Sequence, residues 1–362
     1  MDAGKNEFPV VAVIPSLNPD LKLPDVANGL FQVGFTRLIV VDDGSREGCQ
    51  RIFQQLEKMA GCTVLHHESN CGKGRALKTA FRYYLENFEQ GIYHGVVTAD
   101  ADGQHLPEDI YASAQCLMEN PDALALGTRD FDEESVPFKS RNGNKITTTV
   151  FRCLYGKHIS DTQTGLRAIS NGFLAQCVTV PGERFEYEIN MLIAAVTQKI
   201  PLAEVPIQTV YFNDNRETHF HPVKDSLKIY RVMFASFLKF ACSGAACMVV
   251  DQGLFALFQK VILRALLTNQ AIFLATLFSR VISSLVNYSV NRTVVFEQKK
   301  GGSGSLLRYY TLCVCQMAAS AGGVIVLHAL TRADPSILKL IVDTILFFIS
   351  YRIQRSWVFK ES

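Results

Sequence analysis

Two aspartates, Asp100 and Asp102, follow an apolar run in the segment VVTADADGQH, residues 96–105, and are the first candidates for chemistry. They stand two residues apart where a strand would open into a loop, so both carboxylates can point to one face of an extended segment. Gln104 adds an amide oxygen. Such ligands suit Mg²⁺ or Mn²⁺, which bind through one or two carboxylates while substrate phosphates complete the shell. The alternative is an acidic turn that merely precedes a helix.

Charged residues also follow other apolar runs. Asp42 and Asp43 end the run in VVDDGS. Lys73 stands between glycines in NCGKGRA, where a helical pattern begins, and Arg129 follows the run LALGT. Acids, a metal, a lysine and an arginine that converge at strand ends are typical of a site for a nucleotide diphosphate.

The elements that must position these groups are predicted by the alternation of short apolar runs with helical patterns. This alternation, in the first two thirds of the chain, indicates a parallel sheet with helices on both faces. Ligands bind such sheets at the carboxyl ends of the strands, where the polar residues gather. The expected strands are residues 8–17, 35–45, 62–70 and 95–103, and the expected helices between them are residues 49–60 and 74–88.

The last third of the chain has a different character. Of the 362 residues, 48% are hydrophobic, and the mean hydropathy is positive, which exceeds what a soluble chain usually carries. We interpret four apolar runs as membrane-spanning helices, each of which takes about 20 residues. A buried helical bundle is the alternative. The runs are residues 232–258, 271–290, 309–330 and 337–350.

Basic residues predict the orientation of these spans. They are more frequent between the second and third runs and after the fourth than in the other two loops, so we expect a multi-pass integral membrane protein with both termini in the cytoplasm. The residues are Arg292, Lys299, Lys300 and Arg308, then Arg352, Arg355 and Lys360. Asp251 and Asp343 lie inside expected spans, where a charge usually faces a partner or a polar path.

A short internal echo suggests a duplicated unit in the membrane part. Residues 284–296 close the first pair of spans and residues 346–359 close the second, and both segments end in Arg, two residues and Val-Phe. This pattern predicts a repeated two-helix unit, with chance similarity of helix ends as the alternative.

The net charge and the cysteine spacing argue against a nucleic-acid-binding, zinc-binding or disulfide-rich protein. The formal net charge of +2 gives no general field to hold nucleic acid. The ten cysteines contain no CxxC pair, so neither a zinc site nor a disulfide framework is indicated. His66, His67 and His105 have no ligand-like spacing and are expected to be ordinary surface histidines.

The resemblance of this chain to a known family rests on six motifs, in their order and spacing: VIPSLN, VVDDGS, NCGKGRA, DADGQH, GTRDF and DTQTGLR. Together they resemble the family 2 glycosyltransferases, in particular the dolichyl-phosphate mannose synthase and GtrB group. Residues 232–360 resemble the GtrA family of four-helix membrane proteins. The resemblance implies a Rossmann-like α/β catalytic domain of the GT-A type at residues 1–231, including a juxtamembrane amphipathic segment. An all-α membrane domain with four transmembrane helices would follow at residues 232–362.

The implied activity is inverting transfer of a sugar, a hexose such as glucose or mannose, from a nucleotide diphosphate sugar to a polyprenyl phosphate. The acceptor would be of the undecaprenyl type, in a bacterial plasma membrane, for the assembly of cell-surface glycans. Mg²⁺ or Mn²⁺ would be the cofactor, and a homo-oligomer is compatible with the resemblance. The attacking phosphate oxygen is already ionised near neutral pH, so no strong general base is needed.

The resemblance also assigns residues to roles. The donor would be held by Pro15, Leu17, Asp42, Asp43, Lys73, Asp100 and Ala101. The acceptor phosphate would be held by Arg129, Arg216, His219 and Lys224. Asp102 and Gln104 would hold the metal, and the catalytic set would be Asp100, Asp102, Arg129 and Arg216. For Arg129 the alternative is a structural ion pair, and for Arg216 it is a role at the membrane surface.

Two further motifs stay open. DTQTGLR, with Asp161, Gln163 and Arg167, could close over the donor or cap the next helix. In RFEYEINML, Glu186 and Glu188 could pair with basic residues or belong to a solvated helix face.

Two rival functions are also considered. A processive polysaccharide synthase would carry a Gln-x-x-Arg-Trp motif, and it is disfavoured because the single tryptophan, Trp357, follows the last span. A lipid or sugar translocator with a nucleotide-sensing regulatory domain would bind the nucleotide but form no glycolipid.

Overall fold

The computed structural model describes residues 8–131, 138–208, 222–263, 268–296, 298 and 304–359, without the side chains of residues 138–140, 222–225 and 268–269. The chain divides into two compact units, Met1–Val232 and Met233–Ser362. Each unit is described by itself.

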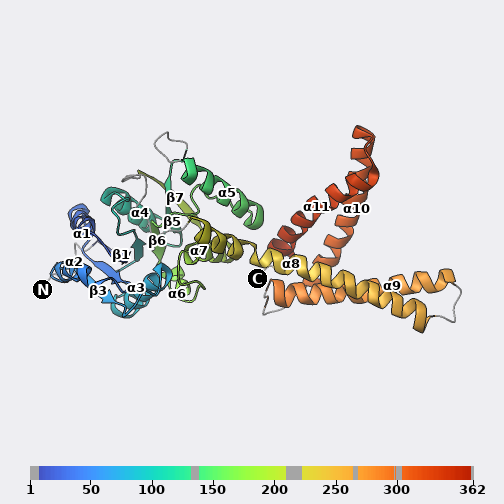
Figure 1. Cartoon of the computed structure of the whole chain (residues 1–362), viewed down its shortest axis with the longest axis horizontal. Helices are drawn as coiled ribbons and strands as arrows, with labels where there is room; N and C mark the ends of the chain where they lie inside the picture. The colour runs from blue at the N-terminus through green and yellow to red at the C-terminus, as the bar shows by residue number, and fades with distance from the viewer. Residues whose placement is uncertain are drawn as a thin grey trace. The chain divides into compact units, whose positions relative to one another are not determined.

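The first unit is built on a seven-stranded sheet with the order β3-β2-β1-β4-β6-β5-β7 (Figure 1). The four strands expected from the sequence are confirmed as β1, β2, β3 and β4. The expectation of a parallel sheet is wrong in one respect, because β6 runs antiparallel to both of its neighbours. The strands are β1 (Val10–Ser16), β2 (Leu38–Asp42), β3 (Cys62–His66), β4 (Gly95–Thr98), β5 (Leu124–Arg129), β6 (Arg167–Ser170) and β7 (Leu202–Ile207).

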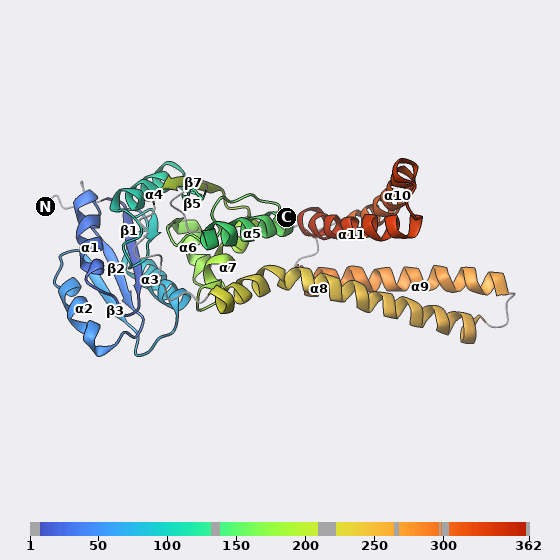
Figure 2. The same ribbon diagram turned by 45° about the horizontal axis from the view of Figure 1, so that its top comes forward.

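Helices cover both faces of this sheet (Figure 2). Helices α1, α2 and α4 pack their apolar sides against one face, where Leu30, Phe53 and Leu117 belong to one buried cluster with strand residues. Helices α3 and α6 contact strands of the sheet, and α7 contacts α3. The helices are α1 (Lys22–Val33), α2 (Gln50–Glu57), α3 (Lys73–Asn87), α4 (Pro107–Glu119), α5 (Phe138–Tyr155), α6 (Asn171–Cys177) and α7 (Glu186–Gln198), with a 3₁₀ turn, η1 (Glu47–Cys49), before α2.

The central strands are apolar because helices bury them from both sides. All seven residues of β1 and all five of β2 are buried, so their sequences read as continuous hydrophobic runs. The polar residues of these two strands, Ser16 and Asp42, stand at their carboxyl ends, which is where the candidate site begins.

The second unit is helical. Helix α8 (Pro222–Leu257) begins in the first unit and is followed by α9 (Thr268–Val290), α10 (Ser305–Thr331) and α11 (Pro335–Ile353). Three segments end in five-residue π-helices: η3 (Phe258–Ile262), η4 (Asn291–Val295) and η5 (Gln354–Val358).

Three helices in the described part of the chain are long and apolar enough to cross a membrane: Ser226–Ile262, Gln270–Val295 and Ser305–Thr331. Three of the four expected spans are therefore recovered in the described residues. The fourth, residues 337–350, lies in α11, which is not among these three helices. Within its 19 residues it carries Lys339, Asp343 and Arg352, which lower its apolar character.

The internal echo corresponds to a repeated local structure. Both echo segments end in a π-helix, η4 in one and η5 in the other. Asn291 Nδ2 donates to Gln354 Oε1 at 3.0 Å, and the rings of Phe296 and Phe359 stack with centroids 5.2 Å apart. The two helix pairs thus meet through equivalent positions, as a duplicated unit would.

The acidic residues inside the helical unit have partners, as expected. Asp251 is buried, accepts a hydrogen bond from Ser283 at 2.9 Å and lies 3.4 Å from Arg280 Nε. Asp343 forms an ion pair with Lys339 at 2.9 Å and accepts a hydrogen bond from Ser320. Such pairing reduces the cost of a charge in an apolar medium.

The start of β4 yields a test of the sheet. Gly95 has a φ of 158°, and a Cβ there would collide with the carbonyl oxygen of Ile169 in β6. We expect Gly95→Ala to lower the free energy of unfolding by roughly 2–4 kcal/mol, because the backbone of one strand must move. The measurement is denaturant unfolding of the full-length protein in detergent, followed by circular dichroism.

Gly91→Ala is the matched control, since the nearest atom that its Cβ would meet is a Glu89 side-chain oxygen at 3.9 Å. Equal unfolding midpoints for the two variants would contradict the close approach of β4 and β6.

Candidate active site

The carboxyl ends of β1 and β2 continue into two loops that are tied together by hydrogen bonds. The backbone N–H of Asn18 donates to Ser45 Oγ at 2.8 Å, and the N–H of Arg46 donates to Asn18 Oδ1 at 2.9 Å. Asn18 has a φ of 51°, a conformation that asparagine tolerates better than most residues. Pro15, in β1, and Leu17, just after it, therefore lie where these loops begin.

Asp42 is a buried carboxylate whose oxygens are taken by protein donors. It accepts hydrogen bonds from Ser45 N at 2.8 Å and from Gln50, and it contacts His66 Nδ1 at 3.1 Å. Burial alone would raise its pKa, but these hydrogen bonds outweigh burial and lower the pKa below its usual value. Asp42 therefore stays ionised and shapes the loop that follows β2.

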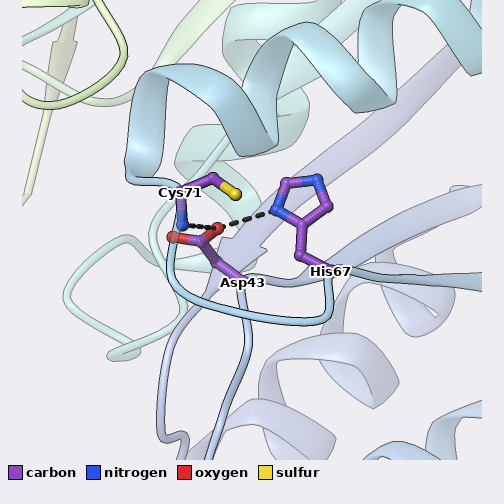
Figure 3. A group of neighbouring side chains, drawn as sticks. All are labelled: Asp43, His67 and Cys71. Carbon is purple, nitrogen blue, oxygen red and sulfur yellow. Dashed lines mark hydrogen bonds and ion pairs between the residues drawn. The ribbon is translucent and has the colours of Figure 1, made fainter.

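Asp43 holds the segment that leads into α3 (Figure 3). Its carboxylate accepts the backbone N–H groups of Cys71 at 2.9 Å and Gly72 at 2.7 Å, and it lies 2.7 Å from His67 Nδ1. Gly72 has a φ of 100°, and a Cβ there would collide with the carbonyl oxygen of Glu183, so glycine is required. These contacts fix the position of the next residue, Lys73.

Lys73 lies between two carboxylates. Its Nζ is 2.6 Å from Asp100 Oδ1 and 2.9 Å from Glu188 Oε1. Burial would lower the pKa of Lys73, but the two carboxylates outweigh burial and raise it. Burial would likewise raise the pKa of Asp100, yet the lysine lowers it to about 2. Lys73 and Asp100 are thus both ionised, and together with Glu188 they join α3, the end of β4 and α7.

Glu188 was left open by the sequence, and the structure decides between the two alternatives. It is only 8% exposed and pairs with Lys73, so it does not belong to a solvated helix face. The sequence contained no direct signal for this pair, because the contact joins helices that are far apart along the chain.

Gly165 of the DTQTGLR motif packs directly against the ion pair. A Cβ at this position would lie 2.6 Å from Asp100 Oδ2 and 3.0 Å from Lys73 Nζ. The antiparallel register explains the proximity: Thr98 is opposite Arg167, so residues two positions further out on each strand also meet. Thr98 Oγ1 fastens the turn by donating to the carbonyl oxygen of Gly165 at 2.8 Å.

Asp102 lies in the same loop as Asp100, two residues further along the chain. Its Oδ1 accepts the backbone N–H of Gln104 at 3.0 Å. Burial and the charge of Asp100 raise the pKa of Asp102 to about 6. The loop therefore carries two carboxylates and the amide of Gln104, and these ligand types fit a hard divalent cation. Ala101 stands between the two aspartates, partly buried.

The expectation of surface histidines is wrong for two of the three. His105 is 7% exposed, and its Nδ1 lies 3.4 Å from the backbone nitrogen of Asp100, which donates to it. Burial lowers the pKa of His105, so its imidazole is neutral at physiological pH. The side chain of His67 is 12% exposed and contacts Asp43. His66, 41% exposed at its side chain, remains a surface residue.

Arg129, at the end of β5, forms a bidentate ion pair. Its Nε and Nη2 atoms lie 2.6 and 3.1 Å from the two oxygens of Asp161, which is fully buried. Asp161 also accepts the backbone N–H of Gln163 at 3.0 Å. The guanidinium of Arg129 lies over the ring of Phe131, 4.9 Å from its centroid. Its position is therefore fixed, while its charge contributes to lowering the pKa of Asp100.

The other arginine of this region is internal. Arg167 is 1% exposed, and it donates from Nε to the carbonyl oxygen of Thr164 at 3.0 Å and from Nη1 to that of Glu188 at 2.6 Å. It thereby fastens β6 to the start of α7, near the carboxylate that pairs with Lys73. The expected acceptor residues Arg216 and His219, and the side chain of Lys224, lie outside the part of the chain that the structure describes.

Comparison with known proteins identifies the two units. Residues 12–177 match the Glycosyl transferase family 2 family, and residues 239–359 match the GtrA/DPMS transmembrane domain. The chain therefore combines a family 2 glycosyltransferase domain with a GtrA-type transmembrane domain. The resemblance drawn from the six motifs is confirmed.

Individual relatives each match a little more than half of the chain. A UDP-N-acetylglucosamine–dolichyl-phosphate N-acetylglucosaminyltransferase from Methanococcus voltae is 29% identical over 56% of this chain and 86% of its own. A polyprenol monophosphomannose synthase from Mycolicibacterium smegmatis is 27% identical over 54% of this chain and 76% of its own. The human dolichyl-phosphate beta-glucosyltransferase is 25% identical over 54% of this chain and 65% of its own.

The close packing of Gly165 provides a test of the site. We expect Gly165→Ala to reduce glycosyl transfer by roughly a hundredfold, because the new methyl group displaces Asp100 and Lys73 from each other. Thermal stability should change little, since the displaced atoms are the ends of side chains. Gly172→Ala is the matched control, because its Cβ would meet nothing within 4 Å. A Gly165→Ala rate equal to that of the control would show that the ion pair is not part of the active site.

Proposed function

We propose that the protein transfers a sugar, such as glucose or mannose, from a nucleotide diphosphate sugar to a polyprenyl phosphate of the undecaprenyl type. The observation that carries this proposal is the group formed by Lys73, Asp100 and Asp102 at the strand ends of a family 2 glycosyltransferase domain. The relatives support the acceptor class, since their names describe transfer to dolichyl phosphate or synthesis of a polyprenol monophosphosugar.

The proposed cofactor is Mg²⁺ or Mn²⁺, held by Asp102 and Gln104. When bound, such a cation neutralises charge on the diphosphate that leaves the sugar. The raised pKa of Asp102 supports this assignment, because a carboxylate with excess neighbouring negative charge gains most from a cation.

The chain's own residues have separate tasks in the proposed reaction. Lys73, held at the start of α3, would face the donor diphosphate, while Asp100 would orient the lysine and the donor sugar. Pro15, Leu17 and the loops tied by Asp42 and Asp43 would border the nucleoside.

Arg129 would align the acceptor phosphate, because a planar fork matches phosphate oxygens. Arg216, His219 and Lys224 remain proposed partners in this task. An acceptor oxygen forms the new bond at the anomeric carbon as the bond to the diphosphate breaks, so one displacement inverts that centre. No proton has to be removed from the attacking oxygen.

The proposal also includes the domain boundaries, the number of membrane spans and their orientation. We place the catalytic domain at residues 1–231 and the membrane domain at residues 232–362, and we include α11 as a fourth span. An even number of spans and the basic residues near η4 and η5 support cytoplasmic termini in a bacterial plasma membrane. A homo-oligomer also remains part of the proposal.

The direct test uses purified full-length protein, a panel of labelled nucleotide sugars and undecaprenyl phosphate. We expect one donor to give a single lipid-linked sugar, only when Mg²⁺ or Mn²⁺ is present. Asp102→Asn should reduce the rate on the order of a thousandfold, because a carboxylate in a hard-cation site contributes several kcal/mol. Asp122→Asn is the matched control at an exposed aspartate.

Three results would contradict the proposal. A protein that binds the nucleotide sugar but forms no glycolipid would be a regulator. A product that grows by repeated addition would indicate a processive synthase. Full activity of Asp102→Asn would show that the metal assignment is wrong.

A conservative substitution distinguishes the two roles considered for Arg129, which are binding of the acceptor phosphate and a structural ion pair. Arg129→Lys keeps a positive charge near Asp161 but loses the planar fork. We expect the KM for the acceptor lipid to rise about tenfold or more, with a smaller loss of thermal stability. Arg75→Lys, which alters the exposed pair between Arg75 and Glu183, is the control. If only the melting temperature falls and the KM is unchanged, Arg129 has a structural role.

A further inference from the structure

Asp43, His67 and Cys71 bring three different metal-ligating side chains together beside the loop that precedes α3 (Figure 3). One ligand atom from each residue lies within 4.8 Å of the others. The three residues differ in exposure: Asp43 is buried, His67 is intermediate and Cys71 is exposed. The cluster is therefore anchored on one side and open to solutes on the other.

We propose that this cluster is a binding site for a thiophilic divalent cation such as Zn²⁺. A thiolate, an imidazole and a carboxylate are a common zinc ligand set, and water can supply the fourth ligand. The hard cations proposed for Asp102 prefer oxygen ligands, so the thiol distinguishes the two sites. The sequence did not indicate this site, because the residues have no regular spacing and are assembled by the ends of β2 and β3.

The carboxylate and imidazole of the cluster need little adjustment to bind one metal ion. The Asp43 Oδ1 and His67 Nδ1 atoms are 2.7 Å apart. Tetrahedral zinc separates nitrogen and oxygen ligands by about 3.3 Å, so this pair would open by only about 0.6 Å. Asp43 is kept in place by the backbone N–H groups of Cys71 and Gly72, which donate to its two oxygens.

The surrounding hydrogen bonds accommodate the protons that must move. When Nδ1 of His67 donates to Asp43 in the metal-free protein, Nε2 accepts from Thr79 Oγ1 at 2.9 Å. With metal on Nδ1, the ring proton shifts to Nε2, which then donates to Thr79 Oγ1 and orients the ligand. Cys71 binds as a thiolate, so its thiol proton, now directed to the Ser69 carbonyl oxygen at 3.2 Å, is released to solvent.

Occupancy would affect the neighbouring active site. The metal would fix Cys71 and draw on the carboxylate that positions Gly72, and the next residue is Lys73. We therefore expect micromolar Zn²⁺ to slow transfer, a consequence that rests on the proposed function. The binding itself does not depend on that function and is tested separately.

The test uses reduced, metal-free, full-length protein in detergent, with Co²⁺ as a spectroscopic probe for zinc. We expect one equivalent of Co²⁺ to bind with the intense near-ultraviolet absorption of a cobalt–thiolate bond. Cys71→Ser should abolish this absorption, and His67→Gln should weaken the affinity at least about tenfold. Cys153→Ser, at another exposed cysteine of the same unit, is the matched control and should behave as the wild type.

The results of these measurements distinguish the proposed metal site from the proposed transferase activity. Absence of thiolate absorption in the wild type, or its persistence in folded Cys71→Ser, would overturn the metal site. Transfer by Cys71→Ser should also lose its sensitivity to Zn²⁺, measured against the rate of the same variant without Zn²⁺. If Co²⁺ binds as expected but no transferase activity exists, the proposed function fails and the metal site stands.

Discussion

The candidate active site depends on one constraint: the charge of Lys73 must be balanced where its side chain is largely buried. Placing an ammonium group in such a position is costly unless carboxylates accompany it, and Asp100 and Glu188 meet this requirement at 2.6 and 2.9 Å. Each member of the trio comes from a different segment, so the trio exists only when α3, the end of β4 and α7 are packed together. Asp102, in the same loop as Asp100, brings a further carboxylate to the site. A divalent cation fits such a site because it offsets carboxylates, and in our proposal Lys73 faces the phosphate of the donor.

The antiparallel strand β6 is what closes this site. If the sheet were fully parallel, the residues just before β6 would lie at the opposite edge from Asp100. Because β6 runs against β4, the turn at Gly165 reaches the carboxyl end of β4 and packs on the ion pair. The same reversal places Arg167 where it can fasten the backbone of Glu188. The deviation from a regular parallel sheet thus brings the DTQTGLR motif to the loop that contains Asp100 and Asp102.

The sequence predicted those features that depend on local patterns. The first four strands, helices α2 and α3, and the gathering of Asp42, Lys73 and Asp100 at strand ends follow from apolar runs that stop at polar residues. Contacts between distant segments could not be predicted in this way. The pairing of Glu188 with Lys73, the burial of His105 and the meeting of His67 with Asp43 depend on the register and packing of separate elements. The sequence around a histidine does not show whether its side chain faces solvent or an aspartate in the folded protein.

In the membrane part, the sequence likewise did not show the contacts that determine how helix α11 is interpreted. A count of charged residues treats Lys339 and Asp343 as two separate costs, yet the structure pairs them at 2.9 Å one turn apart and adds a hydrogen bond from Ser320. An ion pair of neighbouring residues on one helix face costs less to place in an apolar medium than two isolated charges. The repeated π-helical ends support this interpretation, because η5 joins α11 to η4 through Gln354 and Asn291 in the manner of equivalent units. If the segment that ends in η4 spans the membrane, its counterpart needs a comparable environment, and this symmetry supports our proposal that α11 is the fourth span.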